Sequence, residues 1–177
     1  MTYPWAAGEV LTAADLNNYA GLVFIKSQTI GSGVSSVTVT GAFSSTFDNY
    51  RITLNNCDAS NGGCDIQMTL GSTTTNYYYA NIFVSLSTGP NRVAGNNVAF
   101  FDVGEGDSAN QTFFSLDVFG PNLAQRTGIN GIGHGVARTM FVAGNLSDST
   151  QYTAFTITPS VGTLTGGTLR VYGYNNG

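Results

Sequence analysis

The sequence predicts an all-β protein: an antiparallel β-sandwich of jelly-roll type, preceded by one short N-terminal helix. Two observations lead to this prediction. From residue 21 onward, short segments rich in Val, Ile, Thr, Phe and Tyr alternate with turns of Gly, Asn, Ser and Asp, at a spacing typical of antiparallel sheets. Strand and helix patterns do not alternate, which disfavours a parallel sheet. We therefore divide the chain into an attachment segment, residues 1–20, and one β-sandwich domain, residues 21–177.

The only helical pattern lies in the first twenty residues. Thr12 is suited to cap a helix, and Asp15, three positions later, is a short capping-box partner that also matches the helix dipole. The predicted helix covers about residues 13–19 and is too short to be stable alone. Its apolar side chains therefore need a surface, which we expect to be a partner or a neighbouring copy rather than the chain's own sandwich. The predicted docking residues are Trp5, Val10, Leu11, Leu16 and Tyr19.

The segments between the turns are predicted as strands. Several alternate with a period of two, which places every second residue in a core; Tyr50, Ile52 and Leu54 share one such face. A run of glycines at positions 128, 131, 133 and 135 is predicted to mark bulges or a strand crowded against another backbone. The predicted strands are 22–27, 35–40, 49–55, 64–70, 77–87, 97–103, 111–118, 128–137, 140–143, 152–158 and 167–174.

Composition argues against several classes of function. Only 9% of the 177 residues are charged and the net charge is −4, so a basic nucleic-acid interface is not expected. No apolar run is long enough for a transmembrane helix, and the N-terminus lacks the pattern of a signal peptide. So few charges give weak self-repulsion, which suits proteins whose surfaces pack against neighbours. We expect the uncharged faces to be buried in a homotrimer.

Signals for catalysis and metal binding are weak. The only histidine, His134, lies between two glycines and is not expected to act as a catalytic base. The acidic stretch 102–107 lacks the calcium-loop pattern and is predicted to be a solvated turn. Cys57 and Cys64 are close enough in sequence for a disulfide across a turn, but we favour free thiols, and no zinc site is expected. The sequence therefore predicts no enzyme activity, no metal and no cofactor.

Aromatic residues cluster at several positions, and Tyr77, Tyr78 and Tyr79 form the densest run. Aromatic rings stack on sugars and Tyr hydroxyls add hydrogen bonds, so a host surface glycan is one candidate ligand. Adjacent residues of a strand point to opposite faces, however, so one of each neighbouring pair is expected in the core. We favour contacts between subunits as the use of the exposed aromatics, with receptor contact as the alternative.

The N-terminal stretch WAAGEVLTAADLNN resembles a short segment that recurs near the start of tail and fibre proteins of tailed bacteriophages. The stretches 47–56, 70–79 and 163–174 are similar to β-sandwich modules of phage structural proteins. The resemblance implies a non-enzymatic virion structural protein, commonly a homotrimer, assembled in the host cytoplasm. The elements of the N-terminal segment that match are Trp5, Gly8, Val10, Leu11, Thr12, Ala13, Leu16 and Asn17.

Two positions on the particle stay open. A short tail fibre or receptor-binding module, docked to the tail through residues 1–20, would present its sandwich outward for host adsorption, and the N-terminal motif favours this role. The alternative is a capsid decoration protein bound to the head shell, which the short chain without a shaft favours. Neither role requires membrane insertion or contact with nucleic acid.

Overall fold

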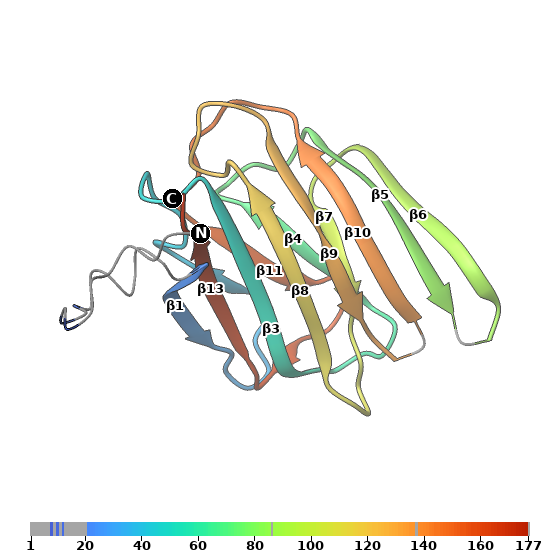
Figure 1. Cartoon of the computed structure of the whole chain (residues 1–177). Helices are drawn as coiled ribbons and strands as arrows, with labels where there is room; N and C mark the ends of the chain where they lie inside the picture. Colours follow the sequence, from blue (N-terminus) through green and yellow to red (C-terminus); the bar gives the residue numbers. More distant parts are fainter. Residues whose placement is uncertain are drawn as a thin grey trace.

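The computed structural model describes residues 8, 10, 12, 21–85, 87–136 and 138–176. Within these residues all regular elements are β-strands, which form two antiparallel sheets that face each other as a sandwich (Figure 1). In this part of the chain the large sheet has nine strands and the small sheet has four. The predicted all-β antiparallel sandwich is therefore confirmed. The predicted helix at 13–19 lies outside the described residues.

The large sheet has the spatial order β1-β13-β3-β8-β9-β10-β5-β6, and the short β12 pairs with β3. Its strands are β1 Leu22–Thr29, β3 Asn49–Ala59, β5 Tyr77–Ser85, β6 Gly89–Val98, β8 Thr112–Phe119, β9 Thr127–His134, β10 Arg138–Leu146, β12 Leu164–Thr165 and β13 Thr168–Tyr174. The small sheet has the order β2-β11-β4-β7. Its strands are β2 Val37–Val39, β4 Asp65–Leu70, β7 Phe101–Glu105 and β11 Phe155–Pro159.

The chain crosses repeatedly between the two sheets. From β1 in the large sheet it passes to β2 in the small sheet, returns in β3 and crosses again to β4. Two hairpins, β5–β6 and β9–β10, are inserted in this path and both join the large sheet, which becomes wider than the small one (Figure 1). At this wide end β7 packs on β8, β9, β10 and β5. The inserted hairpins thus add an extension to one side of the sandwich.

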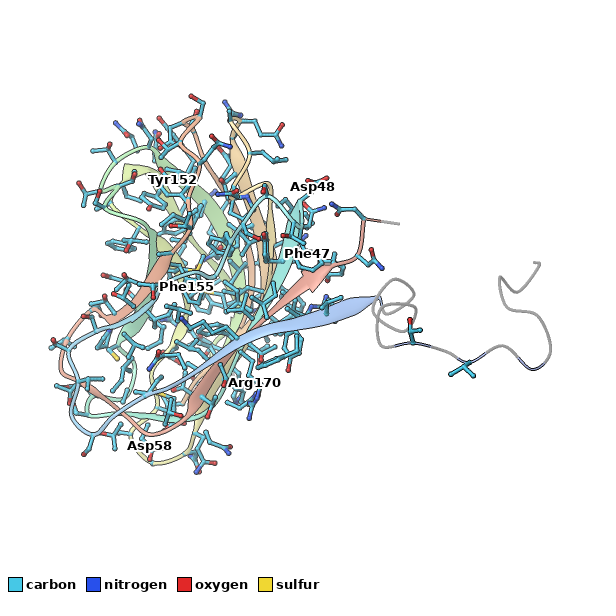
Figure 2. All side chains as sticks on the ribbon, turned by 90° about the vertical axis from the view of Figure 1, so that its left-hand side faces the viewer. Phe47, Asp48, Asp58, Tyr152, Phe155 and Arg170 are labelled. Atoms are coloured by element: carbon cyan, nitrogen blue, oxygen red, sulfur yellow. The ribbon has the colours of Figure 1, made fainter. Side chains whose placement is uncertain are left out.

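The core lies between the sheets and follows the predicted alternation. Ile52 and Leu54 are fully buried, whereas Arg51 and Thr53 lie on the outer face of the large sheet. Figure 2 shows the layers from the side, with Phe155 on the small sheet. Burying these side chains is the main favourable term in folding, at about 1.5–3 kcal/mol each. The same alternation buries Val37, Val39, Phe155, Ile157, Leu169 and Val171.

The structure contains two strands that the sequence pattern did not predict, β6 and β12. The sequence of β6 is GPNRVAGNNV, which has the composition of a turn. This strand stands at the end of the large sheet and pairs with β5. Pro and polar residues are tolerated there because one side of an edge strand leaves its backbone groups unpaired within the sheet. Position at the edge, rather than side-chain pattern, explains why β6 was missed.

Some of the glycines predicted to be crowded, in β9 and directly after it, do lie against a neighbouring backbone. A Cβ on Gly133 would lie 2.9 Å from the Cα of Gly104 on β7 and would collide with the Val103 carbonyl oxygen. Gly135 approaches Glu105 in the same way. Gly128 differs, since its nearest neighbour is the Phe119 side chain at an ordinary 3.5 Å. Glycine at 133 is therefore needed because the backbone of the small sheet packs directly on it.

Candidate functional site

The predicted docking residues are mostly outside the described part of the chain. Trp5, Leu11, Leu16 and Tyr19 fall there, so the structure gives them no position. Val10 is described, and its side chain is 83% exposed. The docking role of residues 1–20 therefore stays a prediction.

The three consecutive tyrosines of β5 have different environments. Tyr77 is fully buried and packs edge-to-face on Phe101, with ring centroids 4.8 Å apart. Its hydroxyl accepts a hydrogen bond from the Leu70 backbone N–H at 2.8 Å and donates one to the Thr73 carbonyl oxygen at 3.2 Å. Burial raises the pKa of Tyr77, and the Leu70 hydrogen bond opposes this rise. Tyr77 is thus a core residue and is not accessible to a receptor.

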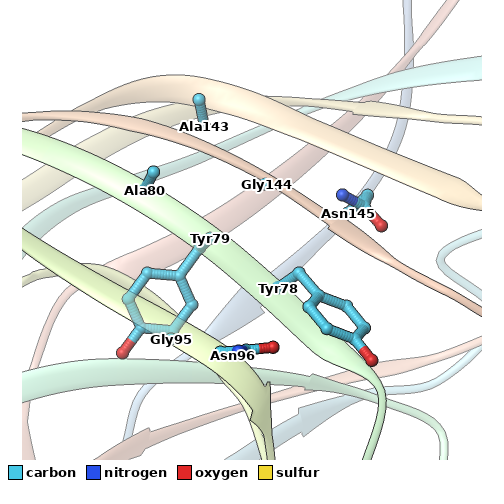
Figure 3. Close-up of a pocket in the computed structure, with 8 residues that line it drawn as sticks. All are labelled: Tyr78, Tyr79, Ala80, Gly95, Asn96, Ala143, Gly144 and Asn145. Carbon is cyan, nitrogen blue, oxygen red and sulfur yellow. The ribbon is translucent and has the colours of Figure 1, made fainter.

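Tyr78 and Tyr79 line a shallow hollow of about 430 Å³ on β5, β6 and β10 (Figure 3). Both rings are partly exposed. Burial raises the pKa of Tyr79 to about 12, and the nearby Asp102 adds to this effect, so its hydroxyl is neutral at physiological pH. The amides of Asn96 and Asn145 also line the hollow, which is otherwise formed by glycine and alanine. Hydroxyls and amides beside an open surface can form hydrogen bonds, but nothing encloses a small molecule here.

The outer face of the large sheet carries an uncovered group of apolar side chains, which we call the apolar band: Ile82, Val84, Ile132 and Phe141. Phe141 of β10 stands directly opposite Ile132 of β9 and Ile82 of β5 in the strand register. The exposed fractions are 45% for Ile132, 52% for Phe141 and 58% for Ile82. A contiguous apolar row of this kind on a soluble protein typically marks an interface.

The rim of the apolar band is polar. Ser115 of β8 continues the row beyond Ile132, and Arg92 of β6 continues it beyond Ile82. An apolar centre with a polar rim is the usual anatomy of a protein–protein interface. The sequence predicted uncharged exposed faces, but it did not locate the band, because the band forms only when strand β5 pairs with the distant β9–β10 hairpin.

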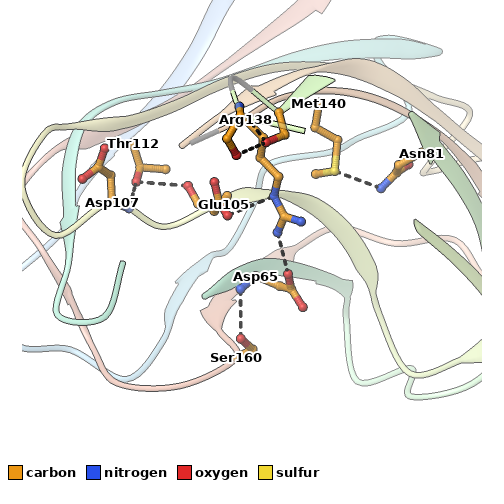
Figure 4. Close-up of polar contacts among 10 residues, drawn as sticks. Asp65, Asn81, Glu105, Asp107, Thr112, Arg138, Met140 and Ser160 are labelled. Atoms are coloured by element: carbon orange, nitrogen blue, oxygen red, sulfur yellow. Dashed lines mark hydrogen bonds and ion pairs between the residues drawn. The ribbon is translucent and has the colours of Figure 1, made fainter. Parts of the chain in front are cut away.

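A partly buried ionic cluster lies at the inner side of the extension (Figure 4). The Arg138 guanidinium pairs with Glu105 through Nε at 3.0 Å and with Asp65 through Nη2 at 3.1 Å. It also lies over the Phe83 ring, 4.8 Å from the centroid. Because these groups come from β4, β5, β7 and β10, the cluster ties the inserted hairpins to the small sheet. Its role in this arrangement is structural.

Asp102 belongs to the same region and corrects the prediction of a solvated turn at 102–107. Residues 101–105 form strand β7, and Asp102 is only 2% exposed. Its Oδ1 atom has no hydrogen-bond partner among the described residues. Burial, with a smaller contribution from the negative charge of Asp65, raises the pKa of Asp102 to about 7. The sequence pattern suggested a turn here because glycines separate the acids of this stretch.

His134 has the contacts of a packed side chain. Its Nδ1 atom lies 2.9 Å from Thr139 Oγ1, and its ring stacks on Phe113 with centroids 4.8 Å apart. Among the described residues no three His, Cys, Asp or Glu side chains are grouped so as to hold a metal ion. Cys57 and Cys64 are buried free thiols, as the sequence favoured.

Comparison of the chain with protein-family models and with curated proteins finds no match. No helix in the described part of the chain is long and apolar enough to cross a membrane.

Proposed function

We propose that this chain is a non-enzymatic structural protein of a tailed-phage particle, most specifically a short tail fibre or receptor-binding module. The observation that carries the proposal is the apolar band on the extension of the large sheet. Only 9% of the residues are charged, and Ile82, Ile132 and Phe141 are exposed. Such a surface suits a subunit of a permanent assembly better than a monomer in solution. The resemblance of residues 5–17 to the start of phage tail proteins favours the phage tail as this assembly.

The strand order supports the more specific prediction that the sandwich has a jelly-roll topology. When the inserted hairpins β5–β6 and β9–β10 and the short β12 are set aside, β1, β13, β3 and β8 face β2, β11, β4 and β7. Successive strands pass between the sheets as they do in a double Greek key of eight strands. Many viral structural proteins have this architecture, although the architecture alone does not define a function.

We propose that the assembly is a homotrimer that buries the apolar band of each copy. Symmetric closure removes the band from water, and burying it stabilises the assembly by about 25 cal/mol for each Å² of apolar surface covered. The edge strand β6, next to the band, would also be shielded from uncontrolled pairing. In this arrangement residues 1–20 dock to the tail, and the sandwich points outward to the host surface.

A capsid decoration protein is the second candidate. An apolar band could equally join copies on a head shell. The stoichiometry of purified particles separates the two roles, because a decoration protein covers the whole shell and a tail fibre occurs only at the tail. Quantitative mass spectrometry should find the chain in far fewer copies than the major head protein. Near-equal amounts would favour decoration, and absence from particles would refute both roles.

Docking is tested by deleting residues 1–20. The truncated chain should fold, because the described sandwich begins at residue 21, but it should no longer enter particles. Circular dichroism and light scattering on the purified truncated chain verify folding. A truncated chain that folds and still enters particles would show that the attachment segment is not the anchor.

A further inference from the structure

A second hollow, of about 310 Å³, lies at the end of the large sheet where β3, β8 and β9 meet their loops. We call it the bulge pocket. It is lined by side chains that the assembly role does not use: Asn55, Asn56, Gln111, Phe113, His134 and Val136. These residues come from three separate parts of the chain, and the fold brings them together.

A β-bulge forms one wall of the pocket. The register between β3 and β8 shifts between Leu54 and Cys57, so that Asn55 and Asn56 together stand opposite the single residue Phe113. Asn56 has a positive φ of 57°, a conformation that few residues other than glycine and asparagine adopt readily. Bulges re-aim side chains and are frequent beside binding sites. Here the bulge leaves two consecutive amide side chains exposed at the pocket.

Phe113 forms the apolar wall. It is 46% exposed although it lies within β8, and its ring stacks on His134 at an interplanar angle of 19°. The hydrogen bond between His134 and Thr139 fixes the imidazole, and the imidazole in turn supports the Phe113 ring. Val136, also exposed, extends the apolar surface at the β9–β10 turn. The pocket thus presents a rigid aromatic ring to solvent.

Asp107 holds the loop that closes the pocket. Its Oδ1 atom accepts hydrogen bonds from the backbone N–H groups of Ala109 at 2.8 Å and Asn110 at 2.9 Å. Its own backbone N–H donates to Thr112 Oγ1 at 2.8 Å. Burial raises the pKa of Asp107, but the hydrogen bonds from Ala109 and Asn110 outweigh burial and hold the pKa below its ordinary value. The loop is therefore pre-organised, with a carboxylate that stays negative.

The amides at the pocket are available to a ligand. Asn55, Asn56 and Gln111 are exposed, and their side chains form no hydrogen bond within the described part of the chain. Each amide offers donors and an acceptor side by side. No Lys or Arg lines the pocket.

We infer that the bulge pocket binds an uncharged sugar unit of a glycan. The apolar C–H face of a pyranose fits against the Phe113 ring, and its neighbouring hydroxyls, each a donor and an acceptor, match the amides of Asn55 and Gln111. Anionic sugars are disfavoured, because no Lys or Arg lines the pocket and Asp107 supplies a negative charge. This inference deepens the proposed receptor-binding role and rests on that role for the origin of the glycan.

The site differs from the tyrosine run that the sequence suggested. Tyr78 and Tyr79 line an open hollow on the far strands of the same sheet, whereas the bulge pocket combines an exposed ring with unpartnered amides and a fixed loop. Glycan binding, if centred on Tyr78, would not respond to changes at Phe113.

The test uses the full chain and defined probes. Saturation-transfer NMR at about millimolar concentrations of methyl glucoside, methyl galactoside and methyl mannoside, followed by an array of neutral and anionic glycans, should detect a neutral sugar. Phe113→Ala and Gln111→Ala should each weaken binding by about tenfold, since each removes one kind of contact. Phe119→Ala is the matched control, because Phe119 is an exposed ring on the same strand outside the pocket.

Each outcome of these binding measurements either supports or refutes the glycan site. Binding that both pocket variants weaken and Phe119→Ala leaves unchanged supports the site. No binding of any neutral glycan, preference for anionic glycans, or binding that survives in Gln111→Ala overturns it. The Gln111 side chain forms no hydrogen bond to any described residue, so this variant is expected to fold even if Phe113→Ala does not. Binding is measured on purified protein and particle incorporation on virions, so failure of the site and failure of the proposed function are seen separately.

Discussion

Arg51 and Asp117 face each other across strands β3 and β8 in a two-pronged ion pair. Arg51 Nε lies 2.8 Å from Asp117 Oδ1, and Arg51 Nη2 lies 2.8 Å from Oδ2. The Tyr174 hydroxyl donates a further hydrogen bond to Oδ1 at 2.6 Å, which links β13 to the pair. In a chain with so few charges, this pair fixes the register of three central strands at their outer face.

Asp117→Asn is expected to lower the free energy of unfolding by about 1 kcal/mol, because a two-pronged pair on a partly exposed surface has about this value. Burial raises the pKa of Asp117, but the hydrogen bonds from Arg51 and Tyr174 outweigh it and lower the pKa. The pair's contribution is therefore present at neutral pH and is lost as the pH falls below about 4. Urea denaturation at pH 7 and pH 3 measures both effects.

Asp58→Asn is the control for the ion pair, because Asp58 is an exposed acid on the same strand. This variant should change the free energy of unfolding at pH 7 by less than about 0.5 kcal/mol. An equal loss of stability in both variants would contradict the role of the pair.

Asp102 is expected to make the protein less stable as the pH rises. Its pKa of about 7 in the folded chain exceeds the ordinary value of about 3.9, so the folded state holds this proton more tightly than the unfolded state. The free energy of unfolding should therefore fall between about pH 4 and pH 7. Asp102→Asn should remove this slope and stabilise the protein at pH 8 by about 4 kcal/mol, with little change at pH 4.

Denaturation curves at several values of pH check the prediction for Asp102. Asp117→Asn is the control, because Asp117 is ionised throughout the range from pH 5 to pH 8 and its variant should keep the slope of the original chain. An unchanged slope in Asp102→Asn would show that the charge of Asp102 is compensated in the folded state, for example by Arg138.

Gly133→Ala is expected to destabilise the sandwich by about 3 kcal/mol or more, because the added methyl group would collide with the backbone of β7. Gly128→Ala on the same strand meets only the Phe119 side chain at 3.5 Å and should be tolerated. Thermal denaturation of Gly133→Ala and Gly128→Ala tests both expectations. Equal melting temperatures would mean that β7 and β9 are not packed as closely as described.

Phe141→Asp is expected to convert the proposed trimer into a monomer of about 18.5 kDa, since it places a charge at the centre of the apolar band. Light scattering at micromolar concentration measures the mass. Phe24→Asp is the control, because Phe24 is equally exposed on the opposite edge of the large sheet. If the original chain is itself a monomer, the proposed trimer does not exist. If only Phe24→Asp breaks the trimer, the interface lies elsewhere than the apolar band.

Cys57 and Cys64 are expected to resist alkylation in the folded protein. Burial raises the pKa of Cys57 to about 11 and also raises the pKa of Cys64, so very little reactive thiolate exists at pH 7.5. Iodoacetamide should label both residues only after denaturation, as read by mass spectrometry. Rapid labelling of the native chain, or failure to label the unfolded chain, would contradict buried free thiols.

The sequence by itself determined the class of fold and most of its core. A strand that lies on a core must bury every second side chain, so the alternation of Tyr50, Ile52 and Leu54 or of Phe155 and Ile157 is a local property that can be read along the chain. The crowding at Gly133 was also predictable, because only glycine lets two backbones approach so closely.

Other features depended on the tertiary structure. The edge strand β6 follows backbone pairing rather than a side-chain pattern, and Asp102 became buried because the inserted hairpins cover β7. The apolar band and the bulge pocket each join residues from several strands. Phe141 lies beside Ile82, and Asn55 lies near Phe113, only through strand register, which is set by long-range pairing. Alternation along one strand is a local property of the sequence. The surface that several strands form together depends on how the strands pair in the folded sheets.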